Sequence, residues 1–270
     1  MRQSLPAEPR SSEEGRTTSH ETARKSGDAR EPAPAFYALR PGGWRDYVTL
    51  LHVPYTAWHL SYVVVGGCLA ASVDWPTLGW TVVAFALAMG VGAHALDELD
   101  GRPLRTEIPS SVLVALAVGS VTVAAAIGIA VALDRTLWIV PLVIVGAALV
   151  PAYNLELLGG RLHNGAGFAL AWGAFPLLTG YFACAGTISW EALLAAAYAT
   201  LMSYAQRVLS TPVRHLRRRV VDVQGTIELR DGGSERVTRE TLAAAPERAL
   251  QTLAAANVAL AVALLVFRLA

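Results

Sequence analysis

Charged residues and cysteines are both scarce in this sequence of 270 residues. Only 16% of the residues are Asp, Glu, Lys or Arg, whereas a soluble domain carries roughly a quarter. The two cysteines, Cys68 and Cys184, each lie inside an apolar run, so neither a disulfide framework nor a clustered thiol metal site is expected. The formal net charge of +1 argues against a basic DNA-binding protein, and we expect no nucleic-acid partner.

Several catalytic signatures are missing as well. The chain contains no HExxH, CxxC, Walker or GxSxG motif, so zinc hydrolases, ATPases and serine hydrolases are not favoured. The sequence is instead 54% apolar, and most of its charge is confined to the first forty residues and to the stretch 207–248. The rest is a series of long apolar runs, which a soluble domain cannot use. A polytopic membrane protein is therefore expected.

Seven apolar segments approach the length of roughly 20 residues that a helix needs to cross a bilayer. Lipid cannot satisfy the open edge of a sheet, so these segments must be helices. The sequence thus predicts an all-α, polytopic transmembrane bundle of about seven spans. The expected spans are residues 47–73, 77–96, 110–133, 137–153, 164–186, 190–209 and 250–269.

The distribution of charge predicts the domain organisation and the orientation. Residues 1–36 are polar and almost free of aliphatic side chains, which predicts a disordered cytoplasmic tail. Residues 40–270 form the expected bundle, with a cytoplasmic loop and a small β-hairpin at about 210–247. Every second loop is rich in arginine, which places the N-terminus in the cytoplasm. We expect a multi-pass protein of the cell membrane.

A cluster of acidic and basic residues closes the second expected span. His94, Asp97 and Asp100 are each three residues apart and share one face of a helix. Carboxylates are hard oxygen ligands for Mg²⁺, and the planar fork of arginine suits phosphate, so the cluster resembles a diphosphate clamp. The alternative is a solvated helix end whose arginines reach lipid phosphates. The expected metal ligands are Asp97, Glu98 and Asp100, and the expected phosphate-binding residues are Arg102 and Arg105.

Two further clusters lie on the same side of the membrane. Tyr153, Asn154 and Arg161 stand in the link between the fourth and fifth spans, where they either line a polar pocket or serve the turn. Asn164 is expected to be the N-cap of the fifth span. Arg207 and Arg214 belong to a basic run after the sixth span, and such runs attract anionic membrane lipids.

The first span carries a polar and aromatic stripe. His52 and His59 are seven residues apart and share a helix face with Tyr55 and Tyr62. This stripe either lines a cavity or packs against other helices.

The order of these pieces resembles the UbiA-type intramembrane prenyltransferases. Asp97-Glu98-Leu99-Asp100, followed by Arg102-Pro103-Leu104, is similar to the Asp-rich motif and the RPL stretch that follow the second span in that family. Tyr153-Asn154, residues 167–181 and Arg40-Pro41 are similar to other family segments, so the resemblance covers about residues 40–220.

The resemblance implies a helical bundle that uses Mg²⁺ to ionise an allylic prenyl diphosphate and transfers the prenyl group to a small or lipid acceptor. It implies catalytic roles for Asp97 and Asp100. The implied substrate-binding residues are His94, Arg102, Arg105, Tyr153, Asn154, Arg161, Arg207 and Arg214, with Arg207 and Arg214 contacting the diphosphate directly.

The chain departs from the family in three respects. Ala95 and Leu96 stand where an Asn-Asp pair is usual, residues 207–219 contain no second Asp-rich motif, and seven spans are expected where nine are common. A catalytically degenerate bundle that binds an isoprenoid or lipid, or that acts as a scaffold, is therefore the alternative function.

A more distant alternative is a CDP-alcohol phosphotransferase. Asp97, Asp100, Gly101 and Arg105 match the first half of that family's signature, but Val114 already stands where the second half requires glycine. A transporter is less favoured, because the acidic residues gather at one membrane face and not near the midplane.

Overall fold

The structure is a computed structural model that describes residues 33–270. Most of the predicted disordered tail lies outside these residues, but its last part, 33–36, is packed against the bundle. The guanidinium group of Arg217 donates to the carbonyl of Ala33 at 3.2 Å. Residues 33–36 therefore belong to the folded unit.

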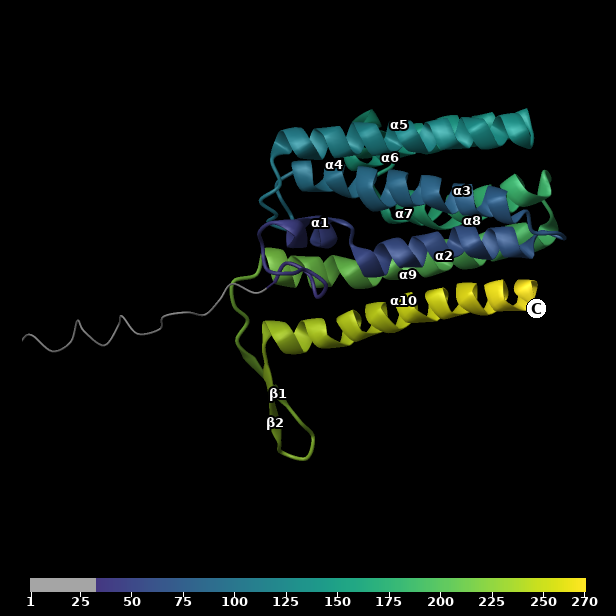
Figure 1. The fold of residues 1–270 in the computed structure, drawn as a ribbon. Coiled ribbons are helices and arrows are strands. Elements are labelled where there is room, and N and C mark those ends of the chain that lie inside the picture. Colours follow the sequence, from purple (N-terminus) through teal and green to yellow (C-terminus); the bar gives the residue numbers. More distant parts are fainter. Residues whose placement is uncertain (1–32) are drawn as a thin grey trace, which may run out of the picture. The chain divides into compact units, whose positions relative to one another are not determined.

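Seven continuous helical segments, counted within the described residues, alternate in direction (Figure 1). They are α2 (Val53–Leu69); α3 (Trp75–Phe85) with the π-helix η1 (Ala86–Ala93) and α4 (His94–Leu99); α5 (Ser110–Asp134); the 3-10 turn η2 (Leu137–Ile139) with α6 (Val140–Asn154); α7 (Gly165–Ala169) with the π-helix η4 (Leu170–Ala174) and α8 (Phe175–Ala185); α9 (Trp190–Arg218); and α10 (Arg239–Leu269). Shorter elements are α1 (Trp44–Leu50), the turn η3 (Leu158–Gly160) and the strands β1 (Gly225–Glu228) and β2 (Ser234–Val237).

Five of these segments are long and apolar enough to cross a membrane. They are Trp75–Leu99, Ser110–Asp134, Leu137–Asn154, Gly165–Ala185 and Arg239–Leu269. The other two, α2 and α9, pack inside the same bundle, α2 against α8 and α10, and α9 against α7 and α10. The described chain is thus an all-α bundle with helices suited to a membrane.

The first expected span is interrupted near its start. The helix stops after α1, His52 adopts a left-handed backbone with φ 45°, and α2 begins at Val53 with Pro54 in its first turn. Proline has no N–H and fits the first turn of a helix, where that donor has no partner. A continuous helix over 47–73 was therefore the wrong prediction, and α2 covers only Val53–Leu69.

Two local predictions are confirmed. Asn164 precedes α7, and its side-chain oxygen accepts from the backbone N–H of Gly167 at 2.8 Å, as expected of an N-cap. The strands β1 and β2 pair antiparallel as a hairpin, with Gly225 opposite Val237.

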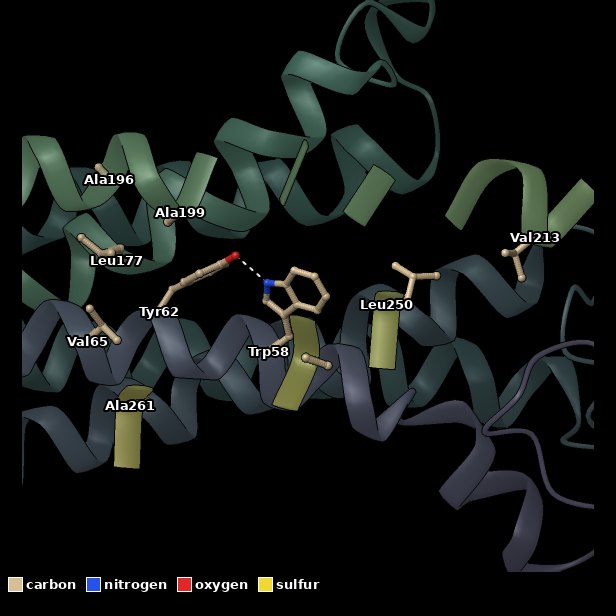
Figure 2. Close-up of a cluster of buried hydrophobic side chains, with 10 residues drawn as sticks. Trp58, Tyr62, Val65, Leu177, Ala196, Ala199, Val213, Leu250 and Ala261 are labelled. Carbon is tan, nitrogen blue, oxygen red and sulfur yellow. Dashed lines mark hydrogen bonds between the residues drawn. The ribbon is translucent and has the colours of Figure 1, made fainter. Parts of the chain in front are cut away.

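The central core joins α2 to α8, α9 and α10 (Figure 2). Trp58 and Tyr62 of α2 are fully buried, and the indole N–H of Trp58 donates to the Tyr62 hydroxyl at 2.5 Å. Leu177 of α8 and Leu250 of α10 are likewise fully buried in this cluster. Residues of α2, α8, α9 and α10 therefore meet around a buried aromatic centre.

Two glycines allow α2 and α8 to approach each other closely. A Cβ atom on Gly66 would lie 2.0 Å from the carbonyl oxygen of Leu177, and one on Gly180 would lie 2.3 Å from that of Val63. Small residues at such crossings bring membrane helices into backbone contact.

Exposed aromatic side chains mark both ends of the bundle. Trp75, Trp138 and Trp190 lie where α3, η2 and α9 start, whereas Trp44 and Tyr47 lie on α1 at the other end. Aromatic residues are enriched at the two interfaces of a membrane. We call the end that holds α1, α4 and the last turns of α9 the basic end.

Candidate functional site: an arginine cluster above an apolar pocket

Three arginines follow one side of α9 toward the basic end. Arg207, Arg214 and Arg218 are separated by seven and four residues, spacings that return to the same helix face. Phe168 of α7 lies beside the first of them, with the guanidinium carbon of Arg207 5.8 Å from the ring centroid. We call Arg207, Arg214 and Arg218 the arginine cluster.

Asp97 of α4 is the acidic residue that faces the arginine cluster. Its side chain is partly buried and interacts electrostatically with Arg214, Arg218 and Arg207. The structure therefore brings together three predicted site residues, Asp97, Arg207 and Arg214, from distant parts of the chain. Because three guanidinium groups face one carboxylate, positive charge is in excess.

Arg214 experiences this excess most strongly. Burial and the neighbouring guanidinium groups of Arg207 and Arg218 lower the pKa of Arg214. Burial disfavours a charged form, and nearby like charges add to that cost. Arginine nevertheless stays protonated in proteins. A bound anion would relieve both costs, so the electrostatics favour an anion at this position.

An aromatic stack connects the arginine cluster to the interior of the bundle. Tyr153 of α6 stacks on His163 with ring centroids 4.7 Å apart and meets Trp172 edge to face at 5.6 Å. Tyr153 also interacts electrostatically with Arg207 and Arg214. Its ring therefore lies between the charged groups and the apolar core.

Three buried polar atoms have no hydrogen-bond partner within the described residues. They are Nε2 of His52, the hydroxyl of Tyr153 and Oε1 of Gln206. Two of them, His52 and Tyr153, interact electrostatically with Arg214. Buried polar groups are nearly always paired, so each such exception needs a reason. A polar ligand at the arginine cluster would supply one.

Glu98 does not belong to this site. It is fully buried, and its Oε1 accepts from the backbone N–H and the hydroxyl of Thr106, each at 2.9 Å. Its Oε2 accepts from the backbone N–H of Leu104 at 2.9 Å. This placement corrects the prediction that Glu98 is a metal ligand, because the carboxylate already holds the loop between α4 and α5.

The same loop uses Arg102. Its guanidinium group donates to the carbonyl of Ile108 at 2.5 Å and to the hydroxyl of Ser110 at 2.8 Å, which fastens the loop to the start of α5. Asp100 is exposed at the end of α4, and Arg105 is half-buried within the loop. The predicted phosphate-binding role of Arg102 is thus corrected, because its guanidinium group is used within the loop. Asp100 is exposed, whereas Asp97 is partly buried.

Of the remaining predicted residues, one lies beside the arginine cluster and two do not. His94 lies beside the site, because its ring stacks on His52 with centroids 3.9 Å apart. Asn154 donates to the carbonyl of Val150 in its own helix at 2.7 Å, and Arg161 is exposed after η3. Neither Asn154 nor Arg161 is placed in the arginine cluster.

The residues do not form a magnesium site by themselves. Within residues 33–270, no group of three or more His, Cys, Asp or Glu side chains is arranged to hold a metal ion. Of the three expected ligands, only Asp97 faces the arginine cluster. Mg²⁺ is bound mainly through carboxylates and phosphate oxygens, and here one carboxylate is offered. The positive charge of this site comes from arginine.

An apolar pocket lies between η1, α5, α6 and the η4–α8 segment. The space it encloses is about 750 Å³ when the open solvent at its mouth is counted. Met89, Val150 and Trp172 line it, and the same three side chains pack with Tyr153 in one buried cluster. Tyr153 therefore contacts side chains that line the pocket and also interacts with the arginine cluster.

Both π-helices border this pocket. Met89 of η1 and Trp172 of η4 line it, and the carbonyl oxygen of Trp172 is 2.8 Å from Nδ1 of His59. A π-helix displaces the usual hydrogen-bond ladder and occurs frequently at functional sites. The position of a π-helix depends on its neighbours, so the sequence contained no clear signal for it.

Three residues of this site were not predicted from the sequence. Arg218 follows Arg214 by four residues, so helix periodicity was a usable signal. Tyr37 and Trp172 had no such signal, because their importance comes from contacts with distant segments. Tyr37 lies 5.2 Å from His52, measured between ring centroids.

Comparison of the chain with protein-family models, with characterised proteins and with solved structures gives no match. The fold and the site define an all-α bundle suited to a membrane, with an arginine cluster at one end and an apolar pocket inside.

Proposed function

We propose that this protein is a UbiA-like membrane protein that binds a prenyl diphosphate, with the diphosphate at the arginine cluster and the prenyl chain in the apolar pocket. The observation that supports this most is that Tyr153, which interacts with the crowded arginine cluster, packs on Trp172, a residue that lines the apolar pocket. Arginine binds phosphate oxygens through two parallel hydrogen bonds. An isoprenoid chain needs a dry, apolar cavity.

The proposed protein spans the cell membrane seven times, with α2 and α9 added to the five apolar helices. The basic loops favour an orientation in which the arginine cluster faces the cytoplasm. Prenyl diphosphates are too polar at one end to lie wholly in lipid, so a site at the membrane surface suits them.

Transfer of the prenyl group to a small or lipid acceptor is the second candidate function, and Asp97 favours it. A carboxylate repels a diphosphate, so a site that only binds this ligand has no use for Asp97. In the transfer, the bond between prenyl C1 and the diphosphate oxygen breaks, and both electrons leave with the diphosphate. The arginines stabilise that charge. The acceptor then bonds to C1, and its proton passes to Asp97.

Binding to the purified protein in lipid nanodiscs tests the proposed function. We expect farnesyl diphosphate to bind at least about tenfold more tightly than farnesol, a difference of about 1.4 kcal/mol. Inorganic diphosphate and phosphatidic acid separate the contributions of the headgroup and of membrane lipid. Because arginine supplies the charge, EDTA is expected to change the Kd by less than about threefold. Equal binding of farnesol and farnesyl diphosphate would contradict the proposal.

A pair of neighbouring alanines on α5 tests the pocket. Ala125 lines the pocket, whereas Ala126 is exposed on the outer face of the same helix. We expect Ala125→Trp to weaken farnesyl diphosphate binding about tenfold or more by filling the pocket, and Ala126→Trp to leave it unchanged. Inorganic diphosphate should bind both variants equally. A loss shared by both variants would argue against this pocket.

The variant Asp97→Asn separates binding from transfer. Removal of a carboxylate from the diphosphate site should tighten farnesyl diphosphate binding by about threefold to tenfold. If the protein transfers the prenyl group, the same variant should release inorganic diphosphate at least about 100-fold more slowly. A variant that binds more weakly than the wild type would show that Asp97 does not face the diphosphate.

A further inference from the structure

The segment 33–43 crosses the basic end of the bundle and is fastened at both ends; we call it the strap. At one end, Arg217 donates to the carbonyl of Ala33 at 3.2 Å, and Arg218 donates to that of Pro34 at 3.5 Å. At the other end, the backbone N–H of Leu39 donates to the hydroxyl of Thr49 at 3.0 Å. Its path therefore leads from the arginine-bearing end of α9 to α1.

The middle of the strap places two aromatic rings against α2. Phe36 and Tyr37 meet edge to face at 5.2 Å, and each is also edge to face with Tyr55, at 6.1 and 5.5 Å. Tyr37 further packs against His52, whose Nε2 is one of the unpaired buried atoms. These contacts hold the ring of Tyr37 against His52 and Tyr55.

Tyr37 is thereby brought to the arginine cluster. Its side chain interacts electrostatically with Arg218, Arg214 and Asp97, and burial together with Tyr55 raises the pKa of the hydroxyl. The hydroxyl therefore stays protonated at neutral pH and can act as a donor.

We propose that Tyr37 is a ligand-contacting residue, whose hydroxyl donates a hydrogen bond to the anionic headgroup held by the arginine cluster while the strap covers it. This inference rests on the proposed function, because it assumes that a diphosphate binds there. A phosphate oxygen is a strong acceptor, and a hydrogen bond to a charged acceptor is stronger than one to a neutral group. Tyr37 would then distinguish a diphosphate from an uncharged prenyl alcohol.

The variant Tyr37→Phe tests the inference, because it removes the hydroxyl and keeps the ring that packs on Tyr55. We expect farnesyl diphosphate to bind about tenfold more weakly, farnesol to bind as it does to the wild type, and the melting temperature of the free protein to stay unchanged. Tyr47, which is exposed on α1, supplies the matched control. The variant Tyr47→Phe should bind both ligands as the wild type does.

The outcomes separate this inference from the proposed function. Suppose that Arg214→Gln loses its affinity for farnesyl diphosphate, whereas Tyr37→Phe binds it as tightly as the wild type does. This result would overturn the role of Tyr37 and keep the proposed site. Equal weakening of farnesol and farnesyl diphosphate would also overturn it, because the hydroxyl would then act through packing. If the wild type binds no prenyl diphosphate, the proposed function fails, and the inference fails with it.

Discussion

Replacement of Arg207 and Arg214 together by glutamine is expected to weaken farnesyl diphosphate binding about 100-fold or more. A hydrogen bond to a charged group contributes about 1.5–3 kcal/mol, and a factor of ten in Kd corresponds to about 1.4 kcal/mol. The loss of two such contacts gives at least this factor. Isothermal titration calorimetry in nanodiscs measures the change directly.

Arg219 is the matched control for this experiment. It ends the same helix, and its side chain is exposed. Arg219→Gln removes one positive charge from the same end of α9, where the double variant removes two, and it should change the Kd by less than about threefold. If Arg219→Gln weakens binding as much as the double variant does, the effect comes from the general charge of this end and not from a defined site.

The variant Arg214→Gln should make the ligand-free protein more stable, although it weakens ligand binding. Arg214 lies between Arg207 and Arg218, and this crowding with like charges lowers its pKa. Arg214→Gln removes that repulsion, so the free protein should gain up to about 1 kcal/mol while it loses the stabilisation by ligand. A thermal unfolding series with and without farnesyl diphosphate reads both effects. A lower melting temperature of the free variant would show that Arg214 has a structural role.

Replacement of Gly66 or Gly180 by alanine is expected to cause the largest loss of stability. A Cβ atom at these positions would lie 2.0 Å and 2.3 Å from backbone carbonyl oxygens of the facing helix. Backbone cannot rotate away as a side chain does, so α2 and α8 must separate. We expect each variant to lose at least about 3 kcal/mol, or a melting temperature about 10 °C lower.

Gly119 on α5 provides the control for this prediction. No atom lies within 4 Å of a Cβ built at Gly119. Gly119→Ala should therefore stabilise the helix by about 0.5–1 kcal/mol, because glycine is a poor helix former. Thermal unfolding monitored by size-exclusion chromatography compares the three variants. Similar melting temperatures for Gly66→Ala and Gly119→Ala would mean that α2 and α8 do not cross as closely as described.

Local patterns in the sequence were sufficient for much of the fold. The apolar runs predicted the helices, because a backbone in lipid must satisfy its hydrogen bonds within the segment. Asn164 and the hairpin at β1 and β2 were also predictable, since a cap and a tight turn depend on a few neighbouring residues. The break at His52 was not, although Pro54 marks the first turn of α2.

The candidate site was predictable only in part. The convergence of Asp97 with Arg207 and Arg214 agrees with the structure, because helix periodicity and alternating spans put these residues at one end. Glu98 and Arg102 are likewise an acidic residue and an arginine, and they stand close to Asp97 in the sequence. Their side chains nevertheless hold the loop between α4 and α5. Residue type alone cannot distinguish these uses, because the partners lie on a loop whose path depends on left-handed residues.

The sequence by itself therefore determined that the chain is an all-α bundle with apolar helices, and at which end of the bundle charge collects. Both follow from composition and spacing, and they do not depend on which helices pack against each other. The tertiary structure decided which charges remain uncompensated, where the pocket opens between helices, and that Tyr37 reaches the arginines. These properties depend on distances between segments far apart in the chain, and the cost or gain of a charge is set by the burial and the neighbours that those distances create.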